Sequence, residues 1–249
     1  MVALEEIIRP TWTNRSNSPR FSYQRKQFNS NPTLLSRILL LEEMLEKWRR
    51  GKRGPLPHLT PLQLLHALLL IDREGPLGRR ALSQALQIND GIARGLLERL
   101  GEQGIVKVNE NGVSLSAQGK TRLRTLLNQM SVKKIEPFEG SDLVPGKSAT
   151  GIHLAGKYRQ GMSGIPERDE AVKSGAQGLI TIGLHERKLV IPPDNRDIGE
   201  LSPKENARLR GLFDLAENDL IVIGFAPDPR RALAGALAAT LAIASSSKP

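Results

Sequence analysis

The sequence contains no cysteine, which excludes disulfides, thiolate nucleophiles and every metal or iron–sulfur site built from cysteine ligands. Aromatic residues make up only 4% of the chain, so Leu, Ile, Val and Ala must build its core. The four histidines show no metal-binding spacing. Residues 1–30 lack the apolar stretch of a secretory leader, and the longest apolar run, 232–244, is short for a membrane span and rich in Ala. We therefore expect a cytoplasmic protein without metal or cofactor.

Positive charge is abundant but unevenly distributed. The net charge of +10 comes almost entirely from residues 1–130, which hold 20 Lys and Arg against 11 Asp and Glu. Residues 131–249 hold 16 Lys and Arg against 15 Asp and Glu. Positive charge confined to one half indicates that this half meets a polyanion, either nucleic acid or an anionic membrane surface.

The length of 249 residues predicts two domains. Residues 1–31 are polar and aperiodic, which is typical of a flexible basic tail. Residues 132–148 mix Pro, Gly and charge without a period and predict a linker. Between and after these segments lie the two expected domains, at 32–131 and 149–249.

The first domain should open with a helix. Its apolar stripe, at alternating steps of four and three, consists of Leu34, Ile38, Leu41, Leu45 and Trp48. The stripe fits either a helix that packs on its own domain or a helix of a short dimeric coiled coil. The basic cluster that follows complements the helix dipole as well as it would fit a phosphate backbone; its members are Arg49, Arg50, Lys52 and Arg53.

Three further helices are predicted, beginning after the cap Thr60, at Arg79 and near Asp90. Alternating residues around Asn111 and Gly112 predict a hairpin, and a last helix should cover 117–130.

The helix expected at 90–103 has two contrasting sides. Its apolar side carries Ile92, Leu96, Leu97 and Leu100. The opposite side carries Gly91, Arg94, Gly95 and Glu98. Two glycines inside a helix cost about 1 kcal/mol each against alanine, so their outward position favours close approach of a DNA backbone. Arg94 could then bind guanine or a phosphate, while Asn89 and Asp90 could contact an adenine edge, a phosphate or only the helix's own amides.

The stretch GRRALSQALQINDGIARGLLERLGEQGIVKVNENGVSLSAQGK, residues 78–120, resembles a winged helix-turn-helix domain. The resemblance implies that 90–103 is the recognition helix and that 109–112 is the wing tip. Glu98 and Glu110 depart from a purely basic surface. The residues expected to bind DNA are Arg79, Arg80, Asn89, Asp90, Gly91, Arg94, Gly95, Arg99, Asn109, Asn111 and Lys120. Winged helices also serve as modules that bind other proteins, and this alternative interpretation stays open.

A wider resemblance covers residues 54–245. Segments such as LTPLQLLHALLLI and DLIVIGFAPDPRRALAGALAA are similar to a family of uncharacterised archaeal proteins that join a winged helix to a small α+β domain. For the second domain this implies a two-layer fold akin to the insert domain of bacterial aspartyl-tRNA synthetases.

The order of expected strands and helices in the second half agrees with a small α+β domain. Strands are expected at 150–157, 178–184, 188–192 and 219–225, with helices at 166–174 and from Ser202 and Pro229. The expected fold is α+β, with the winged helix-turn-helix domain followed by a two-layer α/β sandwich. The Ala-rich last helix could cover its own sheet or meet a second copy.

Signals for chemistry in the second half are weak. GSDLVPGKS, residues 140–148, resembles a P-loop but has five residues instead of four between Gly140 and Gly146, so a linker turn is favoured. Candidates for binding a ligand anion are Arg168, Arg230 and Arg231, although Asp228 competes for the same helix amides. His153 and His185 are expected to be structural or exposed.

These patterns favour a homodimeric, DNA-binding transcriptional regulator that is not an enzyme. Its C-terminal domain would sense a small anionic effector or hold the dimer. Two alternatives remain open: an enzyme in the C-terminal domain acting on a phosphorylated small molecule, and an RNA-binding module.

Overall fold

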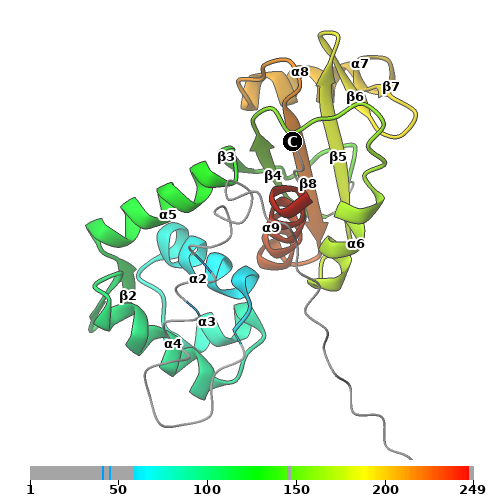
Figure 1. The fold of residues 1–249 in the computed structure, drawn as a ribbon. Helices are drawn as coiled ribbons and strands as arrows, with labels where there is room; N and C mark the ends of the chain where they lie inside the picture. Colours follow the sequence, from blue (N-terminus) through cyan, green and yellow to red (C-terminus); the bar gives the residue numbers. More distant parts are fainter. Residues whose placement is uncertain (1–40, 42–44, 46–58, 145–146, 247–249) are drawn as a thin grey trace, which may run out of the picture. The chain divides into compact units, whose positions relative to one another are not determined.

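The computed structural model describes residues 41, 45, 59–144 and 147–246 (Figure 1). These residues belong to one compact unit that spans 31–249. Leu41 and Leu45 are helical and buried, as the predicted stripe requires. The tail, the other three stripe residues and the basic cluster at 49–53 lie outside the described residues.

The N-terminal part of the described chain follows the predicted order of elements. They are α2 (Pro61–Glu74), α3 (Arg79–Leu86), α4 (Asp90–Glu102), β1 (Val106–Asn109), β2 (Gly112–Leu115) and α5 (Ala117–Gln129). Thr60 caps α2 as expected, because its hydroxyl accepts a hydrogen bond from the Gln63 amide at 3.1 Å and the Gln63 side chain accepts one from the Thr60 amide. Local sequence signals therefore place these boundaries well.

The β1–β2 hairpin is anchored by a third backbone segment. Leu77 and Val113 exchange two hydrogen bonds, of 2.9 and 3.0 Å. Gly112 adopts a φ of +129°, and a Cβ there would stand 2.9 Å from the Leu77 carbonyl oxygen. Glycine is therefore required where the hairpin lies against Leu77.

The C-terminal part is a six-stranded sheet in which every neighbouring pair is antiparallel. In spatial order the strands are β3 (Val132–Pro137), β4 (Ser148–Leu154), β8 (Leu220–Ala226), β5 (Gly178–His185), β6 (Lys188–Ile191) and β7 (Arg196–Asp197). The helices are α6 (Ile165–Lys173), α7 (Ile198–Leu201), α8 (Pro203–Leu212) and α9 (Pro229–Ser246). The predicted α+β class is confirmed.

Strand β3 lies where a linker was expected. It follows α5 almost directly and pairs with β4, with Ile135 opposite Ile152. The sequence hides this strand because its register shifts between Val132 and Lys134 and its burial does not alternate. Residues 132–137 therefore belong to the sheet.

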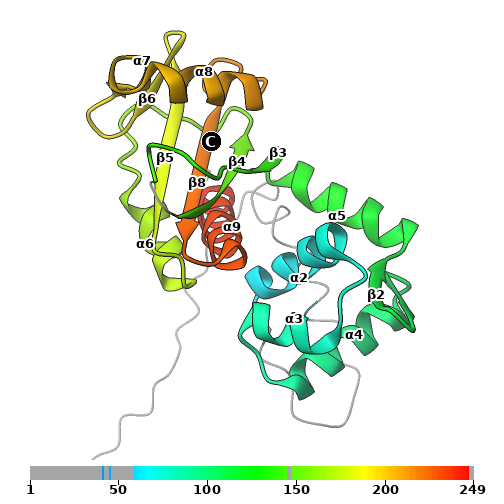
Figure 2. The ribbon, with the colours of Figure 1, turned by 180° about the vertical axis from the view of Figure 1, so that it is seen from behind.

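Helices cover both faces of the sheet, one more layer than the sequence predicted. In the central strand β8, Val222 packs in the cluster that holds Leu233 and Leu237 of α9. The next residue, Ile223, packs on the other side with Leu209 of α8. Figures 1 and 2 view the molecule from opposite sides. They show α9 on one face of the sheet and α7 and α8 on the other. A strand buried on both faces is apolar throughout, which explains the unbroken run at 220–223.

Helix α9 resolves one alternative left by the sequence. Residues 232–240 are all buried within this chain, so the Ala-rich helix covers its own sheet. In the part of the chain that the structure describes, no helix is both long enough and apolar enough to span a bilayer.

Candidate nucleic-acid interface

A sharp turn separates α3 from α4. Gln87 ends α3 in the left-handed conformation at φ 52°, and the Ile88 amide donates to the Ser83 carbonyl at 3.0 Å. The Asn89 side chain then accepts a hydrogen bond from the Ile92 amide at 2.8 Å. Of the roles considered for Asn89, the structure thus shows the capping of its own helix.

The two sides of α4 lie as the sequence predicted. Its buried residues are Ala93, Leu96, Leu97 and Leu100, and Ile92 is half-buried. Gly91, Arg94 and Glu98 are exposed, and Gly95 is half-buried on the same side. This side of α4 is therefore an exposed, charged face that contains two glycines.

Arg94 is held by its neighbour one turn later. Its Nε donates to Glu98 Oε1 at 2.8 Å, and the two side chains are 68% and 57% exposed. Exposed pairs at this spacing contribute well under about 1 kcal/mol, so a phosphate or guanine can displace Glu98 at small cost. The pair orients Arg94 along the outward face of α4.

A second ion pair joins the starts of α3 and α4. Arg79 Nε lies 2.9 Å from Asp90 Oδ1, with both side chains about half exposed. Two residues expected to contact DNA separately therefore contact each other. The pair fixes the relative position of the two helix starts and reduces the positive charge there.

Packing within the described part of the chain does not require glycine at Gly91 or Gly95 of α4. A Cβ on Gly95 would have no atom within 4 Å, and one on Gly91 would meet only Asn89 Oδ1 at 3.4 Å. Neither has a positive φ. Alanine would fit at both positions and would stabilise the helix.

The remaining candidate residues lie on α3, α4, α5 and the hairpin. Arg80 on α3, Lys120 on α5 and the wing-tip residues Asn109 and Asn111 are exposed, and Arg99 is half-buried. The hairpin lies beside α4 and α5 in both views (Figures 1 and 2). Exposed cations that the sequence did not single out are Lys107 on β1 and Arg124 on α5. The signal that would have found Arg124 is the absence of acidic residues from α5.

The three arginines expected to bind an anion have different surroundings. Arg230 forms a two-pronged ion pair with Glu74, at 2.6 and 3.3 Å, and its amide donates to Asp228 at 2.7 Å. The guanidinium of Arg230 is therefore bound by Glu74 and its backbone amide by Asp228. The sequence predicted this competition from Asp228. Arg231 and Arg168 are exposed, on α9 and α6 respectively.

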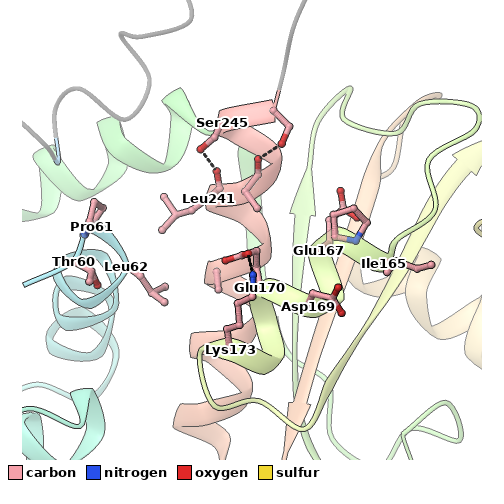
Figure 3. A pocket seen from close by; sticks show the side chains of 14 residues that line it. Thr60, Pro61, Leu62, Ile165, Glu167, Asp169, Glu170, Lys173, Leu241 and Ser245 are labelled. Atoms are coloured by element: carbon pink, nitrogen blue, oxygen red, sulfur yellow. Dashed lines mark hydrogen bonds and ion pairs between the residues drawn. The ribbon is translucent and has the colours of Figure 1, made fainter. Parts of the chain in front are cut away.

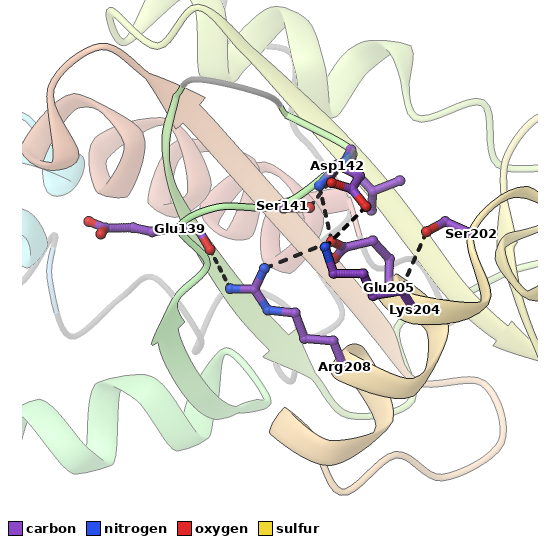
Figure 4. Close-up of polar contacts among 8 residues, drawn as sticks. Glu139, Ser141, Asp142, Ser202, Lys204, Glu205 and Arg208 are labelled. Carbon is purple, nitrogen blue, oxygen red and sulfur yellow. Dashed lines mark hydrogen bonds and ion pairs between the residues drawn. The ribbon is translucent and has the colours of Figure 1, made fainter.

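The P-loop-like segment is attached to α8 by an acidic side chain. The Asp142 amide donates to Glu205 Oε1 at 3.0 Å, and Lys204 lies 3.4 Å from the Asp142 carboxylate (Figure 4). Glu205 is fully buried, and Arg208 donates to the Glu139 carbonyl. A buried carboxylate at these amides opposes a bound phosphate, so the described residues of this segment fit a structural turn.

The two histidines of the second half have local partners. His153 is buried, and its Nε2 lies 2.6 Å from Asp219 Oδ2. Burial alone would raise the pKa of Asp219, but amides of Ala216 and Gly156 and the His153 ring bind its carboxylate and lower that pKa below its usual value. His185 Nδ1 lies 3.7 Å from Glu217. The His153–Asp219 pair ties β4 to the start of β8.

Comparison with known proteins matches two segments of the chain with two different family models. Residues 63–130 match the family model described as the CggR N-terminal DNA binding domain, and residues 145–243 match a domain of unknown function (DUF4443). Hypothetical protein PH0730 from Pyrococcus horikoshii OT3 shares 25% identity with a TM-score of 0.59, over 75% of this chain and 93% of that one. A search of curated proteins gave no significant match. The likeness to a synthetase insert domain and an archaeal origin stay predictions. The chain thus joins a segment similar to a DNA-binding domain of the CggR type to a segment similar to a domain of unknown function.

Proposed function

We propose that this protein is a transcriptional regulator that inserts α4 into the major groove of DNA and places the β1–β2 wing beside it. The similarity of residues 63–130 to a DNA-binding domain supports this role, as does the excess of positive charge in the first half. In such a complex α4 contacts base edges, while Arg80, Lys120 and the wing contact the sugar–phosphate backbone.

One observation carries the proposal: α4 keeps glycines at outward positions where nothing in the described chain needs them. A solvent-facing helix gains stability from alanine, so a second requirement must hold glycine there. Close approach of a DNA backbone is such a requirement, and Arg94 lies on the same face.

Replacing Arg94 by alanine is expected to lower affinity for the preferred site about 10- to 100-fold, because a bidentate contact to guanine contributes about 1–3 kcal/mol of discrimination. The measurement is selection of bound fragments from random duplex DNA at about 150 mM salt, followed by binding isotherms on the selected site. Glu98→Gln, which removes the carboxylate paired with Arg94, should bind more tightly than wild type.

Arg168→Ala is the matched control, since it removes an exposed arginine from α6. An unchanged selected motif in Arg94→Ala would contradict the role of α4. Preference for structured RNA over duplex DNA at equal salt would instead favour an RNA-binding module.

Replacing Gly95 by alanine is expected to separate stability from binding. The free energy of unfolding should rise by about 1 kcal/mol because alanine is the better helix former and its Cβ meets no neighbour. DNA affinity should fall about tenfold because the methyl group holds the DNA backbone away. Denaturant unfolding and binding isotherms measure the two effects.

Gly101→Ala provides the comparison, because Gly101 is another open position near the end of α4. It should stabilise the protein similarly and leave DNA binding unchanged. Equal binding by wild type and Gly95→Ala would refute the close approach.

For the C-terminal domain we propose effector sensing or dimerisation instead of catalysis. A homodimer would read two half-sites related by a twofold axis, so the selected motif should be palindromic. A single unrepeated motif bound by one chain would contradict the dimer.

A further inference from the structure

A small polar cavity of about 260 Å³ lies among four helices of the compact unit. Its walls come from α2, the end of α3, the end of α6 and the first turns of α9. The polar residues that line it are Thr60, Gln63, His66, Gln87, Lys173, Ser174 and Arg231. Its size, slightly below the usual range for drug-sized ligands, suits a small molecule of a few heavy atoms.

His66 is the unusual member of this wall. Its side chain is 3% exposed, and its Nε2 has no hydrogen-bond partner among the described residues. A buried polar atom without a partner destabilises the fold, and such atoms are rare in native proteins. An imidazole of this kind beside a polar cavity indicates that something in the cavity completes its hydrogen bonding.

The charge of the cavity indicates the sign of its ligand. Arg231 makes no ion pair or side-chain hydrogen bond within the part of the chain described, whereas the neighbouring Arg230 is bound by Glu74. Lys173 adds a second cation and lies 2.6 Å from Glu170. Among the described residues that line this cavity there is no carboxylate. A ligand with negatively charged oxygens would gain most from these groups.

The larger neighbouring groove, of about 710 Å³, has the opposite character (Figure 3). It carries three acidic residues of α6, Glu167, Asp169 and Glu170, against one cation, Lys173, beside apolar residues of α2 and α9. An anion would be repelled there. The small cavity is therefore the better anion site of the two.

We propose that this cavity binds a small oxyanion, of the size of inorganic phosphate or a short carboxylate, through Arg231 and His66. The role of this cavity as an effector site rests on the proposed function of the protein. Anion binding by the cavity does not depend on that function. Gln87 in the wall ends α3 at the turn into α4, and Gln63 Nε2 donates to the Leu86 carbonyl at 3.4 Å. An anion can therefore shift the turn that positions α4.

Binding should also change the protonation of His66. Burial lowers the pKa of His66 to about 4, so the ring is neutral at pH 7. Glu74 and Asp228 raise this pKa and Arg230 lowers it. The cavity adds the cations Arg231 and Lys173, and Lys173 is paired with Glu170 outside the lining. An anion beside the ring favours its protonated form, so binding below neutral pH should take up a proton.

The experiment is calorimetric titration of the full chain with inorganic phosphate and, separately, with succinate, at constant ionic strength and in two buffers of different ionisation enthalpy. We expect saturable binding of at least one anion, weakened at least tenfold by Arg231→Gln. His66→Gln should reduce the dependence on buffer by the proton that the ring takes up, and the ionisation of the anion itself should account for the remainder. Arg196→Gln, which alters an exposed arginine of β7 outside the cavity, should bind as wild type does.

Equal binding by wild type and Arg231→Gln would overturn the proposal, and so would the absence of binding to either anion up to about 10 mM, which would leave a water-filled cavity. Duplex DNA binding without added anion tests the proposed function separately. DNA binding without anion binding refutes only the cavity; anion binding without DNA binding refutes only the regulator.

Discussion

Acidification from pH 7 to pH 4 is expected to remove about 3 kcal/mol from the free energy of unfolding through His66 alone. The pKa of His66 is about 4 in the folded protein and about 6.5 in the unfolded chain, because burial opposes the charged ring. Below pH 6.5 the unfolded state binds a proton that the folded state does not, so stability falls as pH falls. Above pH 6.5 both states are neutral and His66 has no effect.

Denaturant unfolding at pH 7, 6, 5 and 4 measures this slope in the wild type and in His66→Gln. In His66→Gln the free energy of unfolding should lose the part of its pH dependence that is due to His66. In His185→Gln, which alters a half-buried ring, that part should remain. Parallel curves for wild type and His66→Gln would show that burial does not hold the pKa down. A bound anion should flatten the wild-type curve, because it favours the protonated ring.

Replacement of Gly224 by alanine is expected to cost about 3 kcal/mol of stability or to prevent folding. Gly224 lies in the central strand β8, directly beneath α9. A Cβ there would stand 2.5 Å from the Ala232 carbonyl oxygen and 2.6 Å from the Ala236 amide nitrogen. Both are backbone atoms, so the new methyl group can be accommodated only if the whole helix moves away from the sheet.

Gly211→Ala is the control, since Gly211 lies in α8 and a Cβ there would have no atom within 4 Å. It should stabilise the protein by about 1 kcal/mol. Thermal unfolding of the two variants beside wild type would reveal opposite shifts. A Gly224→Ala protein as stable as wild type would mean that α9 does not lie this close to β8.

The helices of the first half are largely predictable from local sequence. Thr60, Asn89 and Ser116 act as caps at helix starts, and their side chains accept hydrogen bonds from amides within the same turn. Such signals need no tertiary contact. Strand β3 was not predictable in this way, because an edge strand with a register shift and two exposed lysines lacks alternation.

The candidate interface was predictable only in part. Helical periodicity was sufficient to place Gly91, Arg94 and Gly95 on the outward face of α4. It could not show that Arg94 contacts Glu98 or that Arg79 contacts Asp90, because side-chain pairing depends on where two elements meet. It also gave no reason to select His66, which sits in a strongly apolar helix.

Helix boundaries, the charge asymmetry and the outward face of α4 follow from local sequence, because each depends on residue identity or on neighbours within a few positions along the chain. Tertiary structure alone decided that Arg230 is bound by Glu74, that β8 is buried on both faces, and that His66 and Arg231 share a cavity. Those partners are separated by up to 165 residues of sequence. Long-range packing, which no local pattern encodes, brings them together.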